Sequence, residues 1–180
     1  FTDRGLDEVQ STDGKRDTHV LTLRATGSVR DGEADRRLEL TKEYRFNQNG
    51  FDVSYTLTNG DEERLRTLFA PEINLAFLAQ DADSLKLFVS AGKARPREIG
   101  PSLQALPAAG GVRCDDLVND AIISLSFAQE AELWIVPVET TSSGENGMET
   151  RYQSTSLIPR FPIDLDPGAN FTTSISVKLE

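Results

Sequence analysis

Two glutamates four residues apart, Glu145 and Glu149, lie in a polar stretch that runs from Val138 to Gln153. Paired carboxylates hydrolyse glycosides when they face each other across roughly 5–9.5 Å. Spacing along the chain does not show that these two face each other. They could also dock a ligand or another domain, or form a salt-bridged loop with Arg151 and Gln153, which follow at once. Because side chains bond mostly to nearby groups, all three interpretations stay open.

A second polar pair, Glu72 and Asn74, alternates with Ile73 and Leu75. In a strand this spacing places both polar side chains on one face, about 7 Å apart. A carboxylate beside an amide could hold adjacent sugar hydroxyls. The alternative is that both bond a neighbouring loop or strand backbone.

Stacking on a sugar requires an exposed aromatic face. Trp134, the only tryptophan, lies within the apolar run Leu133–Val136, and this favours a core position. Tyr152 in the polar stretch and Phe161 beside a proline are the better candidates for an exposed ring.

Few residues could support catalysis or bind a metal. His19 is the only histidine, so a sugar epimerase acid or a Ser-His-Asp triad is not expected. Cys114 is followed by two aspartates, which would raise the pKa of its thiol. One cysteine and one histidine do not make a zinc site. The acidic groups near Asp81 and Asp116 lack an EF-hand pattern, so we expect solvated turns and neither a metal nor a cofactor.

Composition narrows the classes of partner. The 180 residues fit one domain, and 38% hydrophobic residues can build a sizeable core. A net charge of −10 disfavours nucleic acid and anionic lipid, whereas neutral sugars are not repelled. No run of 18 apolar residues exists, so no membrane partner is expected. The single cysteine and the lack of a signal-type stretch predict a cytoplasmic location.

Alternation with a period of two predicts strands over most of the chain. It is clearest in Leu38–Phe46 and Phe51–Leu57, which are separated by an Asn-Gly turn. We expect roughly nine to twelve strands and no amphipathic helix, which indicates an all-β sandwich. Residues 1–17 are predicted to be a linker or a frayed terminus, and residues 18–180 a single β-sandwich domain. Gly92–Gly111 is rich in Gly, Pro and Ala and is predicted to be a long loop.

Several segments together resemble a known family. The pattern Glu-Thr-x-Ser-x-x-Glu-x-Gly-x-Glu followed by Tyr-Gln, found in Glu139–Gln153, is similar to the C-terminal β-sandwich domain of unknown function of glycoside hydrolase family 57 4-α-glucanotransferases and amylases. Lys42–Phe46, Val53–Asn59 and Ala70–Leu75 resemble other strands of that domain, so the likeness spans roughly Leu38–Glu180. The family's serine and aromatic are replaced here by Gly144 and Met148, and no sugar contact is carried over to these two positions.

The resemblance implies a large antiparallel supersandwich, similar to galactose mutarotase. The family's catalytic residues lie on a separate barrel, so no catalytic residue is expected here, and the parent chain is expected to be a glycoside hydrolase or glucanotransferase. The domain would support that barrel and contact the α-glucan. Two alternatives are an independent carbohydrate-binding module and an assembly domain without sugar contact. The candidate ligand or docking residues are Glu72, Asn74, Glu145, Glu149, Arg151, Tyr152 and Gln153.

Overall fold

The structure is a computed structural model that describes residues 2–3, 8–13, 19–32, 34–79, 81, 83–144 and 147–180. Within these ranges every regular element is a β-strand, thirteen in all, which confirms the all-β prediction. None of these ranges holds a helix with the length and apolar character needed to cross a membrane. The chain forms two compact units, Phe1–Phe69 with Pro162–Lys178 and Ala70–Phe161 with Leu179–Glu180.

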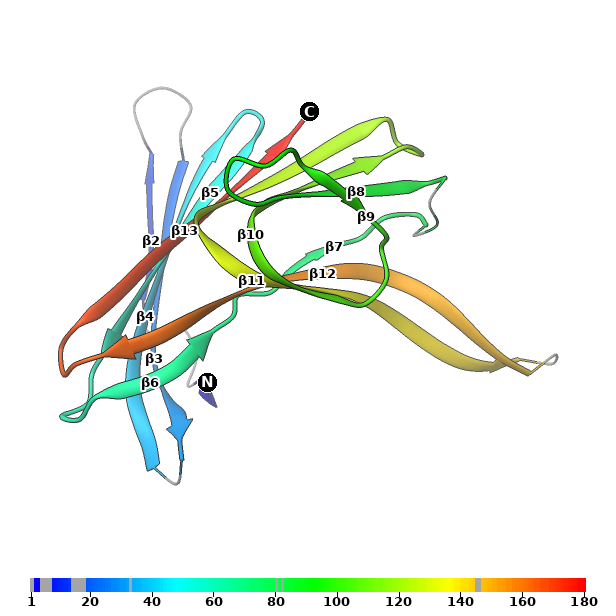
Figure 1. The fold of residues 1–180 in the computed structure, drawn as a ribbon. Helices are drawn as coiled ribbons and strands as arrows, with labels where there is room; N and C mark the ends of the chain where they lie inside the picture. Colours follow the sequence, from blue (N-terminus) through cyan, green and yellow to red (C-terminus); the bar gives the residue numbers. More distant parts are fainter. Residues whose placement is uncertain are drawn as a thin grey trace. The chain divides into compact units, whose positions relative to one another are not determined.

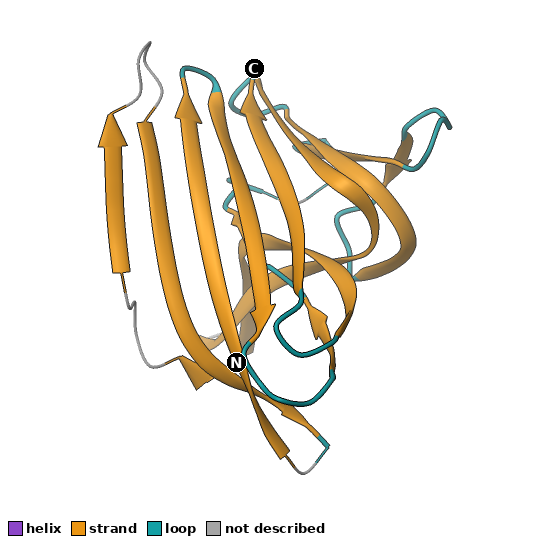
Figure 2. Ribbon diagram, turned by 90° about the vertical axis from the view of Figure 1, so that its left-hand side faces the viewer, coloured by secondary structure: helices purple, strands orange, loops and turns teal. Residues whose placement is uncertain are grey.

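The first unit is built on an antiparallel sheet in the order β1-β3-β4-β5-β13, whose long strands lie side by side in Figure 2. Strand β2 also pairs with β3, and β6 pairs with β12 (Gly147–Leu165). The other strands of this unit are β1 (Thr2–Asp3), β2 (Glu8–Asp13), β3 (His19–Asp31), β4 (Ala34–Asn47), β5 (Gly50–Asn59), β6 (Leu65–Phe69) and nearly all of β13 (Asn170–Leu179).

Alternation decides which side chains this sheet buries. Val53, Tyr55 and Leu57 on β5 are buried, as the sequence predicts, and Ile175 on β13 is fully buried. Strands β1 and β2 lie within residues 1–17, for which the sequence predicts a linker or a frayed terminus. The boundary between that segment and a single domain stays a prediction.

Asn59, at the end of β5, organises the connections of this unit. Its buried side-chain amide donates to the carbonyl oxygens of Glu63 and Leu165, at 2.8 and 3.1 Å, and its Oδ1 accepts the backbone N–H of Asp61. Its backbone bonds to the turn between β12 and β13. Asp166-Pro167-Gly168 forms this turn, since Ala169 N–H donates to the backbone oxygen of Asp166 and Gly168 has a φ of 72°.

The second unit holds β11 between two neighbours (Figure 1). Where β11 pairs with both, the local order is β10-β11-β12-β7. Strands β8 and β9 continue the sheet from β10. The strands of this unit, besides most of β12, are β7 (Ile73–Leu75), β8 (Leu85–Ser90), β9 (Arg97–Ile99), β10 (Gln104–Asp116) and β11 (Ala121–Gly144).

The prediction of one long loop over Gly92–Gly111 is wrong. The segment contains all of β9 and the first half of β10. Gly111 is buried in β10, where a Cβ atom would overlap the backbone oxygen of Leu125 on β11. This glycine therefore permits close approach of two strands and does not mark a turn.

The polar stretch Val138–Gln153 is not a loop between strands either. It is the end of the β11–β12 hairpin, in which Glu139 pairs with Tyr152, Thr140 with Arg151, and pairing continues to Gly144. The side chains of residues 139–143 and 147–151 are exposed on both faces. A strand whose two faces are both exposed to solvent shows no alternation of hydropathy, so its sequence resembles that of a loop.

The hairpin between β4 and β5 depends on Gly50. This residue has a φ of 153°, and a Cβ atom there would overlap the backbone oxygen of Val177 on β13. We expect Gly50→Ala to lower the free energy of unfolding by about 2–4 kcal/mol, because strain and overlap add. Urea unfolding followed by circular dichroism measures the loss. Gly100→Ala is the control, since its φ is ordinary and its nearest contact is at 3.9 Å; equal stability of the two variants would contradict this account.

Candidate functional site

Nine residues of the second unit share one face of the local sheet β10-β11-β12-β7, and we call this set the Trp134 face. Side chains of directly opposed residues point to the same face, as do residues two apart on a strand. Trp134 is opposed by Ala105 and by Ile158, and Ser156 is opposed by Val136 and by Asn74. The full set is Glu72, Asn74, Ala105, Glu132, Trp134, Val136, Ser156, Ile158 and Arg160.

The reverse face of the same strands forms part of the core. Leu133, Ile135 and Leu157 are fully buried, and Leu106 is buried as well. These residues alternate with members of the Trp134 face along β10, β11 and β12. The buried face therefore fixes which side chains are presented on the other side.

Trp134 is held by two charged neighbours. Its indole Nε1–H donates to Glu132 Oε1 at 2.8 Å, and Arg160 Nη1 donates to Glu132 Oε2 at 2.9 Å. The Arg160 guanidinium carbon lies 4.0 Å from the centroid of the indole ring. The ring is thus fixed in direction by a hydrogen bond and a cation–π contact, while 38% of the residue stays exposed.

This contradicts the prediction that Trp134 belongs to the core. Strict alternation in Ala131–Val138 places Trp134 on the same face as Glu132, and that pattern could have identified it as outward-facing. Phe161, a candidate for an exposed ring, is 2% exposed and belongs to the core. Tyr152 is half-buried, and its hydroxyl lies 2.7 Å from Thr155 Oγ1. Burial raises the pKa of that phenol.

Glu72 and Asn74 lie on one face, as the sequence predicts, and both are exposed. Between them Ser156 Oγ, from the buried middle of β12, donates to Glu72 Oε1 at 2.7 Å and contacts the side-chain amide of Asn74. A serine hydroxyl has one hydrogen and can donate to only one of these groups at a time. The carboxylate and the amide are therefore held side by side with unused hydrogen-bonding capacity.

The other predicted site residues lie elsewhere on the hairpin. Arg151 and Glu149 form an exposed ion pair at 3.4 Å, and Gln153 donates to Thr140 Oγ1 at 3.1 Å. These contacts match the local, salt-bridged interpretation of the stretch. Glu145 lies outside the described residues.

Among the described candidates, Glu149 does not converge with Glu72 and Asn74. Glu149 precedes Ser156, the contact of Glu72 and Asn74, by seven residues on β12. At about 3.3 Å per residue the two sites are about 20 Å apart along the strand.

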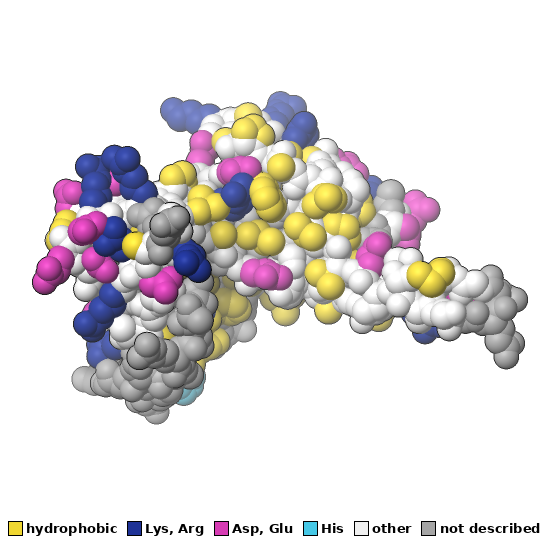
Figure 3. All heavy atoms as spheres, turned by 90° about the horizontal axis from the view of Figure 1, so that it is seen from below, with side chains coloured by type: hydrophobic (Ala, Val, Ile, Leu, Met, Phe, Trp, Pro, Cys, Tyr) yellow, Lys and Arg dark blue, Asp and Glu magenta, His cyan; other side chains and the backbone are white. Residues whose placement is uncertain are grey.

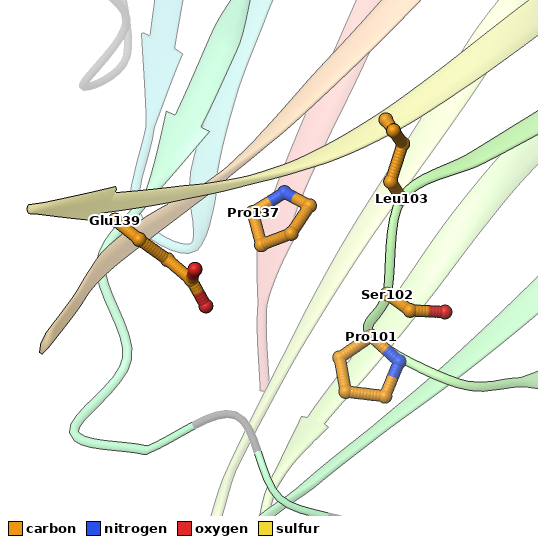
Figure 4. Close-up of a pocket in the computed structure, with 5 residues that line it drawn as sticks. All are labelled: Pro101, Ser102, Leu103, Pro137 and Glu139. Carbon is orange, nitrogen blue, oxygen red and sulfur yellow. The ribbon is translucent and has the colours of Figure 1, made fainter. Parts of the chain in front are cut away.

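A small hollow of about 290 Å³ opens beside β11. Pro101, Ser102 and Leu103, on the segment that leads into β10, line it together with Pro137 and Glu139 on β11, as Figure 4 shows. This volume is at the lower end for ligand sites, and the lining is mostly apolar.

Hydrophobic side chains also gather on the surface of this unit. Figure 3 shows them, with few charges among them, over the part of the molecule that contains β11 and β12. Trp134 and Val138 on β11 and Leu103 before β10 are among the large hydrophobic residues that are exposed. Patches of this kind mark interaction sites more often than a scattered exposed leucine does.

The remaining candidates for catalysis or metal binding are either exposed or hydrogen-bonded to nearby residues. His19 is exposed at the start of β3. Asp81 accepts hydrogen bonds from Ser84 and the backbone of Asp83, and Asp116 accepts from Asn119 and the backbone of Val118. These bonds lower the pKa of both carboxyl groups. Among the described residues no group of three or more acidic, histidine or cysteine side chains could hold a metal ion.

Comparison with known proteins places the chain in a family. Residues 10–175 match the family described as α-amylase/4-α-glucanotransferase, C-terminal. Over 144 residues the chain is 30% identical to α-amylase 1 of Dictyoglomus thermophilum, covering 78% of this chain and 20% of that protein. The chain thus spans about a fifth of the length of this relative.

Two solved structures show the same fold. The 4-α-glucanotransferase of Thermococcus litoralis matches with a TM-score of 0.67 and 18% identity, over 94% of this chain and 22% of that one. A galactose mutarotase-like protein of Lactobacillus casei matches with a TM-score of 0.58 and 13% identity, over 96% of this chain and 73% of that one. The predicted galactose mutarotase-like supersandwich is therefore confirmed.

The reactivity of the Cys114 thiol tests whether this side chain is buried. The residue is fully buried, and burial, followed by the nearby charge of Asp115, raises the pKa of its thiol to about 12. At pH 8 almost no thiolate exists in the folded state, so we expect a thiol reagent such as Ellman's reagent to react at least about 100-fold more slowly with folded than with urea-unfolded protein. Equal rates in the two states would contradict the burial of Cys114.

Proposed function

The chain belongs to the α-amylase/4-α-glucanotransferase C-terminal family, and we propose that it is a non-catalytic accessory domain of a longer α-glucan-acting enzyme. In that enzyme, a glycoside hydrolase or glucanotransferase, it supports the catalytic barrel and contacts the glucan. The observation that carries the proposal is the family match over residues 10–175 in a chain that spans about a fifth of its relative. The parent enzyme is proposed to be cytoplasmic.

The geometry of the candidate residues supports a role other than catalysis. A glycosidase needs two carboxyl groups within about 10 Å, on either side of one bond. Glu72 and Glu149 belong to sites about 20 Å apart along β12. Glu149 is also paired with Arg151 on its own strand.

Support for a neighbouring domain has a physical basis in the exposed apolar surface of the second unit. Interfaces between domains of one chain usually bury 600–1,500 Å², and exposed apolar patches often mark such contacts. The exposed side chains of Leu103 and Val138 suit such a contact.

A second candidate function is that of an independent carbohydrate-binding module. It is favoured by one observation, the exposed and fixed indole of Trp134 on the same face as Glu72 and Asn74. Aromatic rings beside hydrogen-bonding groups are suited to neutral sugars.

Removal of this segment from the parent enzyme tests the accessory role. We expect the apparent Tm of the truncated enzyme to fall by about 5 °C or more, because an interface worth a few kcal/mol is lost. Turnover of soluble starch should fall at least about threefold. Differential scanning calorimetry and a reducing-sugar assay measure the two effects.

The matched control adds the separately expressed 180-residue chain to the truncated enzyme. Partial recovery of Tm in the mixture attributes the loss to a lost contact and not to a damaged barrel. A truncated enzyme with the Tm and starch turnover of the full-length protein would overturn the proposal.

A further inference from the structure

We propose that the Trp134 face binds an α-linked gluco-oligosaccharide across the strands β11, β12 and β7. This inference rests on the α-glucan-acting parent proposed above and names the residues and the ligand. The indole of Trp134 supplies the stacking surface, Ile158 the apolar floor, and Glu72 with Asn74 the groups that bind hydroxyls.

The register sets the distance between these groups. Trp134 on β11 is opposed by Ile158 on β12. On the other edge of β12, the adjacent residue Leu157 is opposed by Ile73 on β7. Glu72 and Asn74 flank Ile73, so they lie two strand spacings from Trp134, about 10 Å. A single pyranose ring cannot reach both ends of this span, whereas adjoining rings of an oligosaccharide can.

The ring of Trp134 is prepared for binding before any ligand arrives. Its Nε1–H donates a hydrogen bond to Glu132, and the guanidinium carbon of Arg160 lies over one side of the ring, 4.0 Å from its centroid. Since Arg160 and Glu132 neutralise each other, the cluster adds no net charge to the face. A ring with a fixed rotamer loses little side-chain entropy when a sugar stacks on it.

The polar end of the face has the groups that a sugar diol needs. Ser156 holds Glu72 and Asn74 side by side, and both side chains are exposed. The carboxylate can accept from two adjacent hydroxyls, and the asparagine amide can both donate and accept. A carboxylate packed against an apolar protein surface would lose its water without compensation, whereas a sugar diol replaces that water with two hydrogen bonds.

The charge of the chain favours a neutral ligand. With 29 acidic and 19 basic residues, the net charge of −10 repels anionic ligands. A neutral oligosaccharide carries no charge to be repelled, so its binding should be nearly independent of salt.

The only tryptophan of the chain provides the measurement. We expect maltotriose to change the emission of Trp134 in a saturable titration of the 180-residue chain, with at least about tenfold tighter binding than glucose. Cellotriose, which has the wrong linkage geometry, should bind at least about threefold more weakly. The titration should be unchanged between low and moderate salt.

Variants locate the site by calorimetry. Trp134→Ala should weaken maltotriose binding at least tenfold, and Glu72→Ala and Asn74→Ala at least threefold each. Phe46→Ala is the matched control, because Phe46 is also 38% exposed but lies on β4 in the first unit. It should leave the affinity unchanged, and circular dichroism shows whether each variant is folded.

Three outcomes would overturn the inference. The first is no saturable response up to about 50 mM maltotriose, well above the millimolar range of weak binding. The second is an equal loss of maltotriose affinity in Phe46→Ala and Trp134→Ala, and the third is an emission change that follows protein concentration and not sugar, which would make the face a self-association surface. These results would remove glucan contact through the Trp134 face but leave support of the catalytic barrel intact, since that support is tested by truncation of the parent. Conversely, a truncated parent that behaves as full length would remove the accessory role without affecting the titration.

Discussion

The register between β11 and β12 is the constraint on which the second unit depends. Leu133, Ile135 and Leu157 are fully buried, and each contributes about 1.5–3 kcal/mol of hydrophobic stabilisation. A slip of one residue would expose all three and turn Trp134 and its neighbours into the core. The position of every side chain on the Trp134 face follows from this burial on the opposite side.

The ion pairs of this chain orient side chains more than they stabilise the fold. Arg160 and Glu132 are partly exposed, and pairs of this kind are worth about 0–1 kcal/mol. Their effect is geometric, since together they determine where the indole of Trp134 points. The Arg64–Asp164 pair in the first unit is similarly exposed and links the start of β6 to the end of β12.

The sequence predicts a strand well when one face of that strand is buried and the other is exposed to solvent. Alternation identified β4 and β5 because apolar residues, such as the buried Leu38 on β4 and Val53 and Leu57 on β5, alternate with polar residues. It failed in the outer β11–β12 hairpin, where both faces are wet, and in β10, where Gly111 is required by the closeness of a neighbouring strand. Within the candidate site, the placement of Glu72 and Asn74 on one face followed from their spacing alone. Their link through Ser156, 82 residues from Asn74, depends on which strands become neighbours, and local pattern does not contain that information.

Asn59 illustrates how the fold can also control chemical ageing. In a free chain an Asn-Gly pair loses ammonia readily, because the backbone nitrogen of glycine attacks the asparagine amide. Here the amide of Asn59 is buried and held by two carbonyl oxygens, while the nitrogen of Gly60 is engaged with the carbonyl of Arg37. Conversion to aspartate would also place a carboxylate against those two carbonyls. The folded state therefore protects this pair from deamidation, whereas Asn49-Gly50, where Asn49 is exposed on a hairpin turn, has no such burial.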